Sequence, residues 1–221
     1  MSQNTKNDAP DGKLLVLTPG MGAVATTFIA GVESIRKGHT KPIGSLTQMQ
    51  TIRLGARSEN RSPLIKDFLP LADLNDLTFG GWDVKPDNVY DACLHANVLK
   101  PQDVDPIADF LKGIKPMAAA FEQKYVKLLD GPNVKEFTTK KDLAEQLRED
   151  IRNKMKETGA SRAVMVWCGS TEVYQSPSAC HMSAEAFEKG MEDNDEAISP
   201  SQLYAYAAIM EGVPYANGAP N

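Results

Sequence analysis

The stretch KLLVLTPGMGAVATTFIAGV, residues 13–32, constrains the fold most strongly, because the period of its apolar residues changes partway along. The apolar run 14–17 is continuous, as in a strand buried on both faces. Further on, Val24, Phe28 and Val32 are spaced four apart, which predicts one face of a helix. Between them, residues 20–25 (GMGAVA) fit the pattern G-x-G-x-x-G/A. The stretch predicts a strand, a tight glycine turn and a helix whose N-terminus suits a dinucleotide phosphate, with a plain β–α turn as the alternative.

Further strand-like runs alternate with helical stretches, which favours an α/β fold with a doubly wound, Rossmann-like parallel sheet. The run 74–84 (LNDLTFGGWDV) predicts a second strand that meets a Gly-Gly break and ends at Asp83. The run 163–167 predicts a third strand, followed directly by a Cys-Gly-Ser-Thr turn. Residues 44–68 are polar and aperiodic, and we interpret them as an excursion inserted at the rim of the sheet.

Three segments carry helical patterns. Residues 87–99 space apolar side chains as a helix does, with Asp87 placed to cap it. Residues 138–159 open on a threonine, close on a glycine and repeat apolar residues every four positions, which predicts a long helix. Residues 199–213 predict a capped amphipathic helix that leads into the sequence PYANGAPN.

The predicted strand ends identify a candidate site. In an open parallel sheet, ligands bind beyond the carboxyl ends of the strands. The segments 20–25 and 169–171 lie at such ends, as does Asp83. An acid that binds ribose usually follows the glycines by about 20 residues. Asp83 comes much later, so this role requires residues 44–68 to be an insertion before the second strand.

Composition excludes several classes of protein. The net charge of −5, without any cluster of basic residues, argues against a nucleic-acid-binding surface. The three cysteines form no C-x-x-C pair and are typical of reduced thiols in a cytosolic protein. Residues 1–12 are polar and predict a disordered leader, not a signal peptide. No apolar run approaches membrane-spanning length. The sequence contains no clustered metal ligands, and we expect no metal site.

Six ordered segments are specific enough to indicate a family: GMGAVATTFIAGV, GSLTQMQTIRLG, FGGWDV, LREDI, VMVWCGSTEV and MEGVPYANGAPN. With them the chain resembles the myo-inositol-1-phosphate synthases (inositol-3-phosphate synthases), specifically their bacterial branch. The eukaryotic branch has an asparagine-rich glycine loop where this chain has Ala23-Val24-Ala25. The resemblance implies a tetrameric, cytoplasmic, NAD-dependent isomerase of inositol and phospholipid biosynthesis. Such an enzyme converts glucose 6-phosphate to inositol phosphate by transient oxidation, enolisation, aldol cyclisation and reduction.

The resemblance also implies roles for individual residues. The glycine turn would hold the pyrophosphate, Asp83 the adenosine ribose, and the turn after the third strand the nicotinamide half. Arg148 matches a cofactor-contacting arginine, although its position on a helix otherwise suggests a solvated charge. Gly218 and Ala219 match another cofactor-facing loop. The full set of expected NAD contacts is Gly20, Met21, Gly22, Ala23, Val24, Ala25, Asp83, Arg148, Cys168, Gly169, Ser170, Thr171, Gly218 and Ala219.

The family's catalytic lysines and its tetramer-forming sheet follow the NGAPN segment, so we expect residues 13–221 to be an incomplete NAD-binding domain without catalytic residues. A fragment, an incomplete gene and a split protein all fit this sequence.

Two other functions remain open. An NAD-dependent dehydrogenase would need a proton acceptor near the cofactor, but no histidine follows a predicted strand end. The other is a non-catalytic dinucleotide-binding module.

His181 adjoins Cys180, and we favour a surface turn there over a thiol–imidazole pair.

Overall fold

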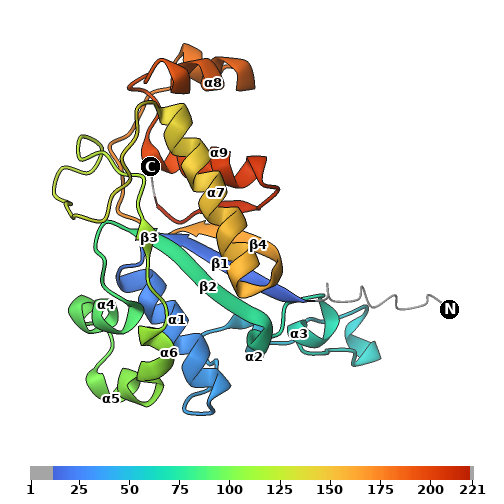
Figure 1. Ribbon diagram of the computed structural model, residues 1–221. Helices are drawn as coiled ribbons and strands as arrows, with labels where there is room; N and C mark the ends of the chain where they lie inside the picture. Colours follow the sequence, from blue (N-terminus) through green and yellow to red (C-terminus); the bar gives the residue numbers. More distant parts are fainter. Residues whose placement is uncertain (1–11, 220–221) are drawn as a thin grey trace.

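The computed structural model describes residues 12–219, so the predicted leader lies outside the described residues except for Gly12. Five strands form one parallel sheet in the order β3-β2-β1-β4-β5 (Figure 1). This order matches the first five strands of the Rossmann order 3-2-1-4-5-6, and it confirms the predicted α/β class. The strands are β1 (Lys13–Pro19), β2 (Leu77–Asp83), β3 (Met117–Ala118), β4 (Ala160–Trp167) and β5 (Tyr215–Asn217).

The central strand β1 is buried on both faces, as its continuous apolar run predicts. Leu15 and Leu17 point into one hydrophobic cluster, whereas Val16 between them points into the other. Val16 pairs in register with Phe79 of β2 and Val164 of β4, and both pack on the same face as Val16. The two clusters make this a doubly wound sheet with helices on both sides.

Helices cover the two faces in chain order. The face of Val16 carries α1 (Ala23–Arg36), α4 (Val89–Ala96), α5 (Pro101–Val104) and α6 (Ala108–Lys112). The face of Leu15 carries α7 (Lys140–Thr158) and α9 (Pro200–Met210), with α8 (Ala184–Glu192) packed beyond them. Within residues 12–219, no helix has the length and apolar character needed to cross a membrane.

The long helix α7 is the most accurately predicted helix. Thr139 caps its N-terminus by accepting a hydrogen bond from the Asp142 N–H, and Gly159 ends it with φ +66°. Leu143, Leu147 and Ile151 are fully buried along one face. The capping residue, the terminal glycine and the apolar stripe can all be identified in the sequence, and together they are sufficient to predict such a helix.

Three local predictions are wrong. The buried stripe of α1 is Ala25, Ile29 and Val32, whereas Val24 and Phe28 are 66% and 42% exposed, because a strict spacing of four drifts around the helix. Asn88, not Asp87, caps α4 by accepting from the Asp91 N–H. Finally, the two glycines at 80–81 do not break β2 but lie inside it, paired with β1.

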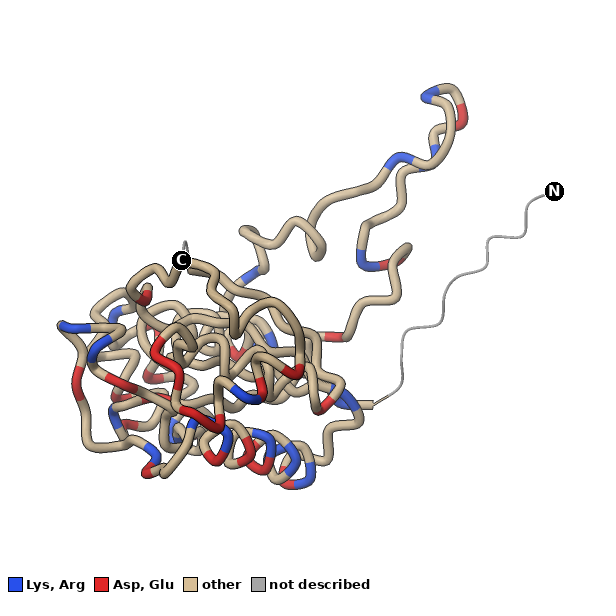
Figure 2. Tube along the Cα trace, turned by 90° about the horizontal axis from the view of Figure 1, so that it is seen from above, with Lys and Arg blue, Asp and Glu red and all other residues tan. Residues whose placement is uncertain are grey.

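The excursion between α1 and β2 forms an arm that extends from the body of the molecule (Figure 2). We call residues 44–68 the arm. It contains two single-turn helices, α2 (Leu46–Met49) and α3 (Ile65–Phe68), and an antiparallel bridge between Thr51 and Leu64. None of its residues is buried. The arm therefore receives almost no support from either hydrophobic cluster.

We expect the arm to exchange its amide hydrogens fastest within residues 12–219. Only a few hydrogen bonds join its two facing segments, such as the one from the Ile52 N–H to the Pro63 carbonyl, and no buried side chain holds these segments together. Hydrogen exchange followed by mass spectrometry tests this, with buried α7 peptides as the slow control. Exchange of arm amides at the rate of global unfolding would contradict the prediction.

Candidate functional site

A cavity of about 350 Å³ opens at the carboxyl ends of the strands. Its wall comes from the turn after β1, the ends of β2 and β4, the loop after β3 and the first turns of α9. The predicted site residues that line it are Gly20, Gly22, Ala23, Val24, Asp83, Cys168, Gly169 and Ser170. Three predicted segments, far apart in sequence, are thus brought together at one place.

The glycine turn is shaped by close backbone contact. Gly20 has φ +85°, and a Cβ added there would lie 2.4 Å from the Gly169 Cα. The Gly20 N–H donates to the Trp82 carbonyl, and the Cys168 N–H donates to the Pro19 carbonyl. These contacts tie the ends of β1, β2 and β4 together, and only glycine fits at the crossing point.

The N-terminus of α1 is left open toward this cavity. Gly22 is the N-cap residue, and within the described chain no side chain caps the helix and no acidic residue lies in its first turn. The first intrahelical bond runs from the Thr26 N–H to the Gly22 carbonyl. The N–H groups before Thr26 that lack a helical partner, together with the helix dipole, form a binding position for a phosphate.

Asp83 lies at the end of β2 beside this helix terminus. Its Oδ2 accepts a hydrogen bond from the Met21 N–H at 2.7 Å and its Oδ1 accepts one from the Lys85 N–H at 2.9 Å. Burial raises the pKa of this carboxyl, although the two backbone bonds oppose the rise. Each oxygen keeps a second lone pair, so the carboxylate can accept both hydroxyls of a ribose diol.

Asp83 also borders a second cavity of about 190 Å³, on the side of α4. Met21, His95 and Ala96 contribute to its wall, so the predicted residue Met21 faces this smaller cavity and not the larger one. Asp83 therefore lies between the two cavities and lines both of them.

The opposite end of the main cavity lies at the turn after β4. Cys168, Gly169 and Ser170 line it, whereas Thr171 does not. Burial raises the pKa of the Cys168 thiol, which favours the neutral form over a reactive thiolate. The backbone of this turn can therefore contact a ligand, but Cys168 is not suited to act as a nucleophile.

Glu172 is a buried acid on this wall that the sequence analysis missed. Its side chain accepts two hydrogen bonds from Ser201, one from the N–H at 2.9 Å and one from the hydroxyl at 2.5 Å. Ser201 lies in the first turn of α9, so Glu172 occupies the N-terminus of that helix. Of the two helices that begin at this cavity, α1 is therefore the one whose N-terminal N–H groups have no side-chain acceptor among the described residues.

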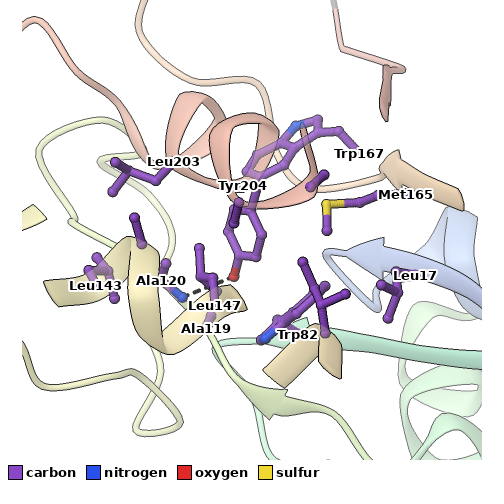
Figure 3. Close-up of a cluster of buried hydrophobic side chains, with 14 of the residues drawn as sticks. Leu17, Trp82, Ala119, Ala120, Leu143, Leu147, Met165, Trp167, Leu203 and Tyr204 are labelled. Atoms are coloured by element: carbon purple, nitrogen blue, oxygen red, sulfur yellow. Dashed lines mark hydrogen bonds between the residues drawn. The ribbon is translucent and has the colours of Figure 1, made fainter. Parts of the chain in front are cut away.

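An aromatic cluster closes the base of the cavity (Figure 3). Tyr204 of α9 lies between Trp82 and Trp167, with ring centroids 5.1 and 5.6 Å away. Its hydroxyl accepts a hydrogen bond from the Ala120 N–H at 2.9 Å, which binds α9 to the loop after β3. Trp82 and Trp167 are 0% and 7% exposed, so both are packing residues at the ends of their strands.

Five predicted cofactor residues lie outside both cavity walls: Ala25, Arg148, Thr171, Gly218 and Ala219. Arg148 on α7 is held by acidic residues, its Nε donating to Glu211 and its NH1 to Glu145, both at 2.7 Å. Gly218 follows β5 and its N–H donates to the Trp167 carbonyl. The direct contact of these five residues with a cofactor stays a prediction.

The surface turn favoured at Cys180 and His181 is wrong. Cys180 is 5% exposed, and its Sγ lies 3.6 Å from His181 Nδ1 and 3.1 Å from Ser178 Oγ. A short 3₁₀ turn at Ala179–His181 brings the neighbouring side chains to the same side. This cluster does not line the main cavity.

Known proteins with this sequence pattern decide the family. Residues 14–221 match the NAD-binding family described as myo-inositol-1-phosphate synthase. The chain belongs to the myo-inositol-1-phosphate synthase family. The inositol-3-phosphate synthase 1 of Bacteroides thetaiotaomicron is 50% identical over 212 residues, which cover 95% of this chain and 49% of that protein. The Trypanosoma brucei brucei inositol-3-phosphate synthase is 34% identical over 184 residues, covering 80% of this chain and 35% of that protein.

A solved structure agrees with this family membership. The crystal structure of inositol-3-phosphate synthase from Caenorhabditis elegans superposes with a TM-score of 0.86 at 26% identity. The superposed region covers 96% of this chain and 45% of the nematode chain. The chain thus spans about half the length of the synthases it matches. Because the matching family is an NAD-binding one, the cofactor of this chain is NAD, as predicted.

Replacing Gly22 by valine is expected to weaken NAD binding severely while leaving the fold intact. A Cβ at Gly22 meets nothing within 4 Å, so the new side chain would project into the space of the pyrophosphate. We expect affinity to fall about 100-fold, equivalent to about 2.8 kcal/mol, and Tm to fall by no more than about 4 °C. Calorimetric titration and thermal melting measure both. Gly20→Ala is the contrasting variant, because its Cβ would overlap Gly169 and lower stability. Unchanged NAD affinity in Gly22→Val would show that the turn is only structural.

Asp83 is expected to make the chain prefer NAD over NADP. A carboxylate that accepts a ribose hydroxyl repels a phosphate at the same position. Asp83→Asn should bring the Kd values for NAD and NADP closer together, because it weakens NAD binding and relieves the repulsion of the NADP phosphate. Lys85→Ala is the matched control, because that lysine is the one cation lining both cavities in the described chain and its loss should only disfavour NADP further. Tighter binding of NADP than NAD by the unaltered chain would refute the assignment.

Proposed function

We propose that residues 13–221 act as the NAD-binding part of an inositol-3-phosphate synthase. The whole enzyme would convert D-glucose 6-phosphate to 1D-myo-inositol 3-phosphate. The observation that supports this most strongly is the open N-terminus of α1 beside Asp83, in a chain 50% identical to a named synthase over 95% of its length. We further propose that the complete protein is a cytoplasmic homotetramer of inositol and phospholipid biosynthesis.

In this role NAD would accept a hydride from C5 of the sugar and return it after ring closure. The residues of this chain would bind and orient the cofactor. The first turn of α1 would hold the pyrophosphate and Asp83 the adenosine ribose. The turn after β4 would then lie against the nicotinamide half, over the aromatic base formed by Trp82, Trp167 and Tyr204. Burial of these rings would keep water from that end of the cavity.

We expect the 221-residue chain to bind NAD without converting glucose 6-phosphate. Oxidation at C5 and enolisation build negative charge on oxygen, and this charge needs nearby cationic groups. In the described part of the chain, Lys85 is the one cation that lines the cavity, and it lies at the Asp83 end. Turnover is expected only when the remaining half of a relative, such as the Bacteroides synthase, is added. Chromatographic detection of inositol phosphate measures it.

The same assay separates the other candidate functions. Absorbance of reduced nicotinamide should not accumulate during turnover by an isomerase, because the hydride is returned to the product. Net accumulation would favour an ordinary dehydrogenase. NAD binding without turnover in the reassembled mixture would favour a non-catalytic module. Robust inositol phosphate formation by the 221-residue chain alone would contradict the prediction and show that Lys85 or another residue of this half is sufficient.

A further inference from the structure

The main cavity carries an uneven distribution of charge. Within residues 12–219, the charged side chains on its wall are Asp83, Lys85 and Glu172. Asp83 is the last residue of β2 and Lys85 follows it, whereas Glu172 follows β4, and β1 lies between these two strands. Neighbouring strands are about 4.8 Å apart, so β2 and β4 are roughly 10 Å apart. The β4 end therefore has a negative charge with no described cation beside it on the wall.

Glu172 is held in place as a carboxylate. It is 4% exposed, and both of its oxygens accept hydrogen bonds from Ser201. Accepting at both oxygens is the pattern of an ionised acid, and the N-terminus of α9 stabilises that form. Burial raises the pKa of Tyr215, and the nearby Glu172 raises it further.

A dinucleotide bound as proposed above places its rings at opposite ends of the cavity. With the pyrophosphate on α1 and one ribose on Asp83, the nicotinamide half extends over β1 toward β4 and Glu172. The oxidised nicotinamide ring carries a positive charge and the reduced ring carries none. A buried carboxylate at this end attracts only the oxidised form, and the attraction is strong where water is excluded.

We propose that Glu172 makes this site prefer NAD⁺ over NADH, by fixing a buried negative charge at the end of the cavity where the nicotinamide ring lies. The inference rests on the proposed function for the placement of that ring. It assigns Glu172 as a positioning and selectivity residue, with Ser201 as its anchor. A preference of this kind also favours return of the hydride, because the oxidised cofactor is the form that the site stabilises.

The test is calorimetric titration of the 221-residue chain with NAD⁺ and with NADH. We expect the unaltered chain to bind NAD⁺ about tenfold more tightly, the order of a single charge interaction in a partly screened site. Glu172→Gln removes the charge and keeps the size of the side chain. Its amide oxygen can still accept from the Ser201 N–H, and its NH2 group can donate to the Ser201 hydroxyl, which reverses the direction of that bond. It should abolish the preference by weakening NAD⁺ binding while NADH binding is unchanged.

Two matched variants separate charge from structure. Ser201→Ala keeps the charge of Glu172, so any loss of affinity should be shared by NAD⁺ and NADH and the ratio of their Kd values should stay the same. Asp83→Asn alters the adenosine end, which is identical in both forms, and should also leave the ratio unchanged. Partial unfolding of a variant reduces both apparent affinities by the same factor, so the ratio remains informative.

The remaining outcomes each overturn the inference. An equal Kd ratio in the unaltered chain and in Glu172→Gln would remove the electrostatic role. So would tighter binding of NADH by the unaltered chain. Loss of both cofactor forms in Glu172→Gln would identify a structural support and not a selectivity residue. Failure of the unaltered chain to bind either form would instead refute the proposed function, and the inference with it.

Discussion

The cavity depends on how closely the backbone of three neighbouring strands can approach at their carboxyl ends. A Cβ at Gly20 would lie 2.4 Å from the Gly169 Cα, and one at Gly81 would lie 2.2 Å from the Thr18 carbonyl oxygen. Such distances are excluded for any residue with a side chain, so the strand ends can meet only where glycine is present. This close approach aims α1 at the centre of the site and sets Asp83 beside its first turn.

The opposite wall is held by polar groups that lie far from the glycine turn. Lys140, at the start of α7, is almost fully buried, and its Nζ donates to Tyr125 Oη and to the Asp195 carbonyl, both at 2.8 Å. Burial lowers the pKa of this lysine, while Glu122 opposes the shift. Together with Glu172 and Tyr204, this lysine joins the loop after β3 to the segment that begins α9. Lys140, Glu172 and Tyr204 are thus buried polar groups held by hydrogen bonds, and such groups tolerate little change in geometry.

The sequence predicts the parts of this molecule whose structure is determined locally. The change of period after β1, the glycine turn, the end of β2 at Asp83 and both ends of α7 follow from residues close together in the chain. The loop at 119–129 could not be predicted, because β3 contains only Met117–Ala118 and the following residues have no period. Glu172 escaped prediction for a related reason, since its partner Ser201 is 29 residues away. The resemblance placed Arg148 at the cofactor, and its ion pair with Glu211 across two helices is likewise invisible in sequence.

The arm has a consequence for how the chain can be altered. It leaves the body after α1 and returns before β2, and the residues on either side of it are held in place by the pairing of β1 with β2. Its tip, near the left-handed Asn60, contributes nothing to either hydrophobic cluster. A protease cut or an inserted peptide tag at that tip would leave the two halves joined through the sheet. The arm is therefore the natural place to open or extend this chain without disturbing the cofactor cavity.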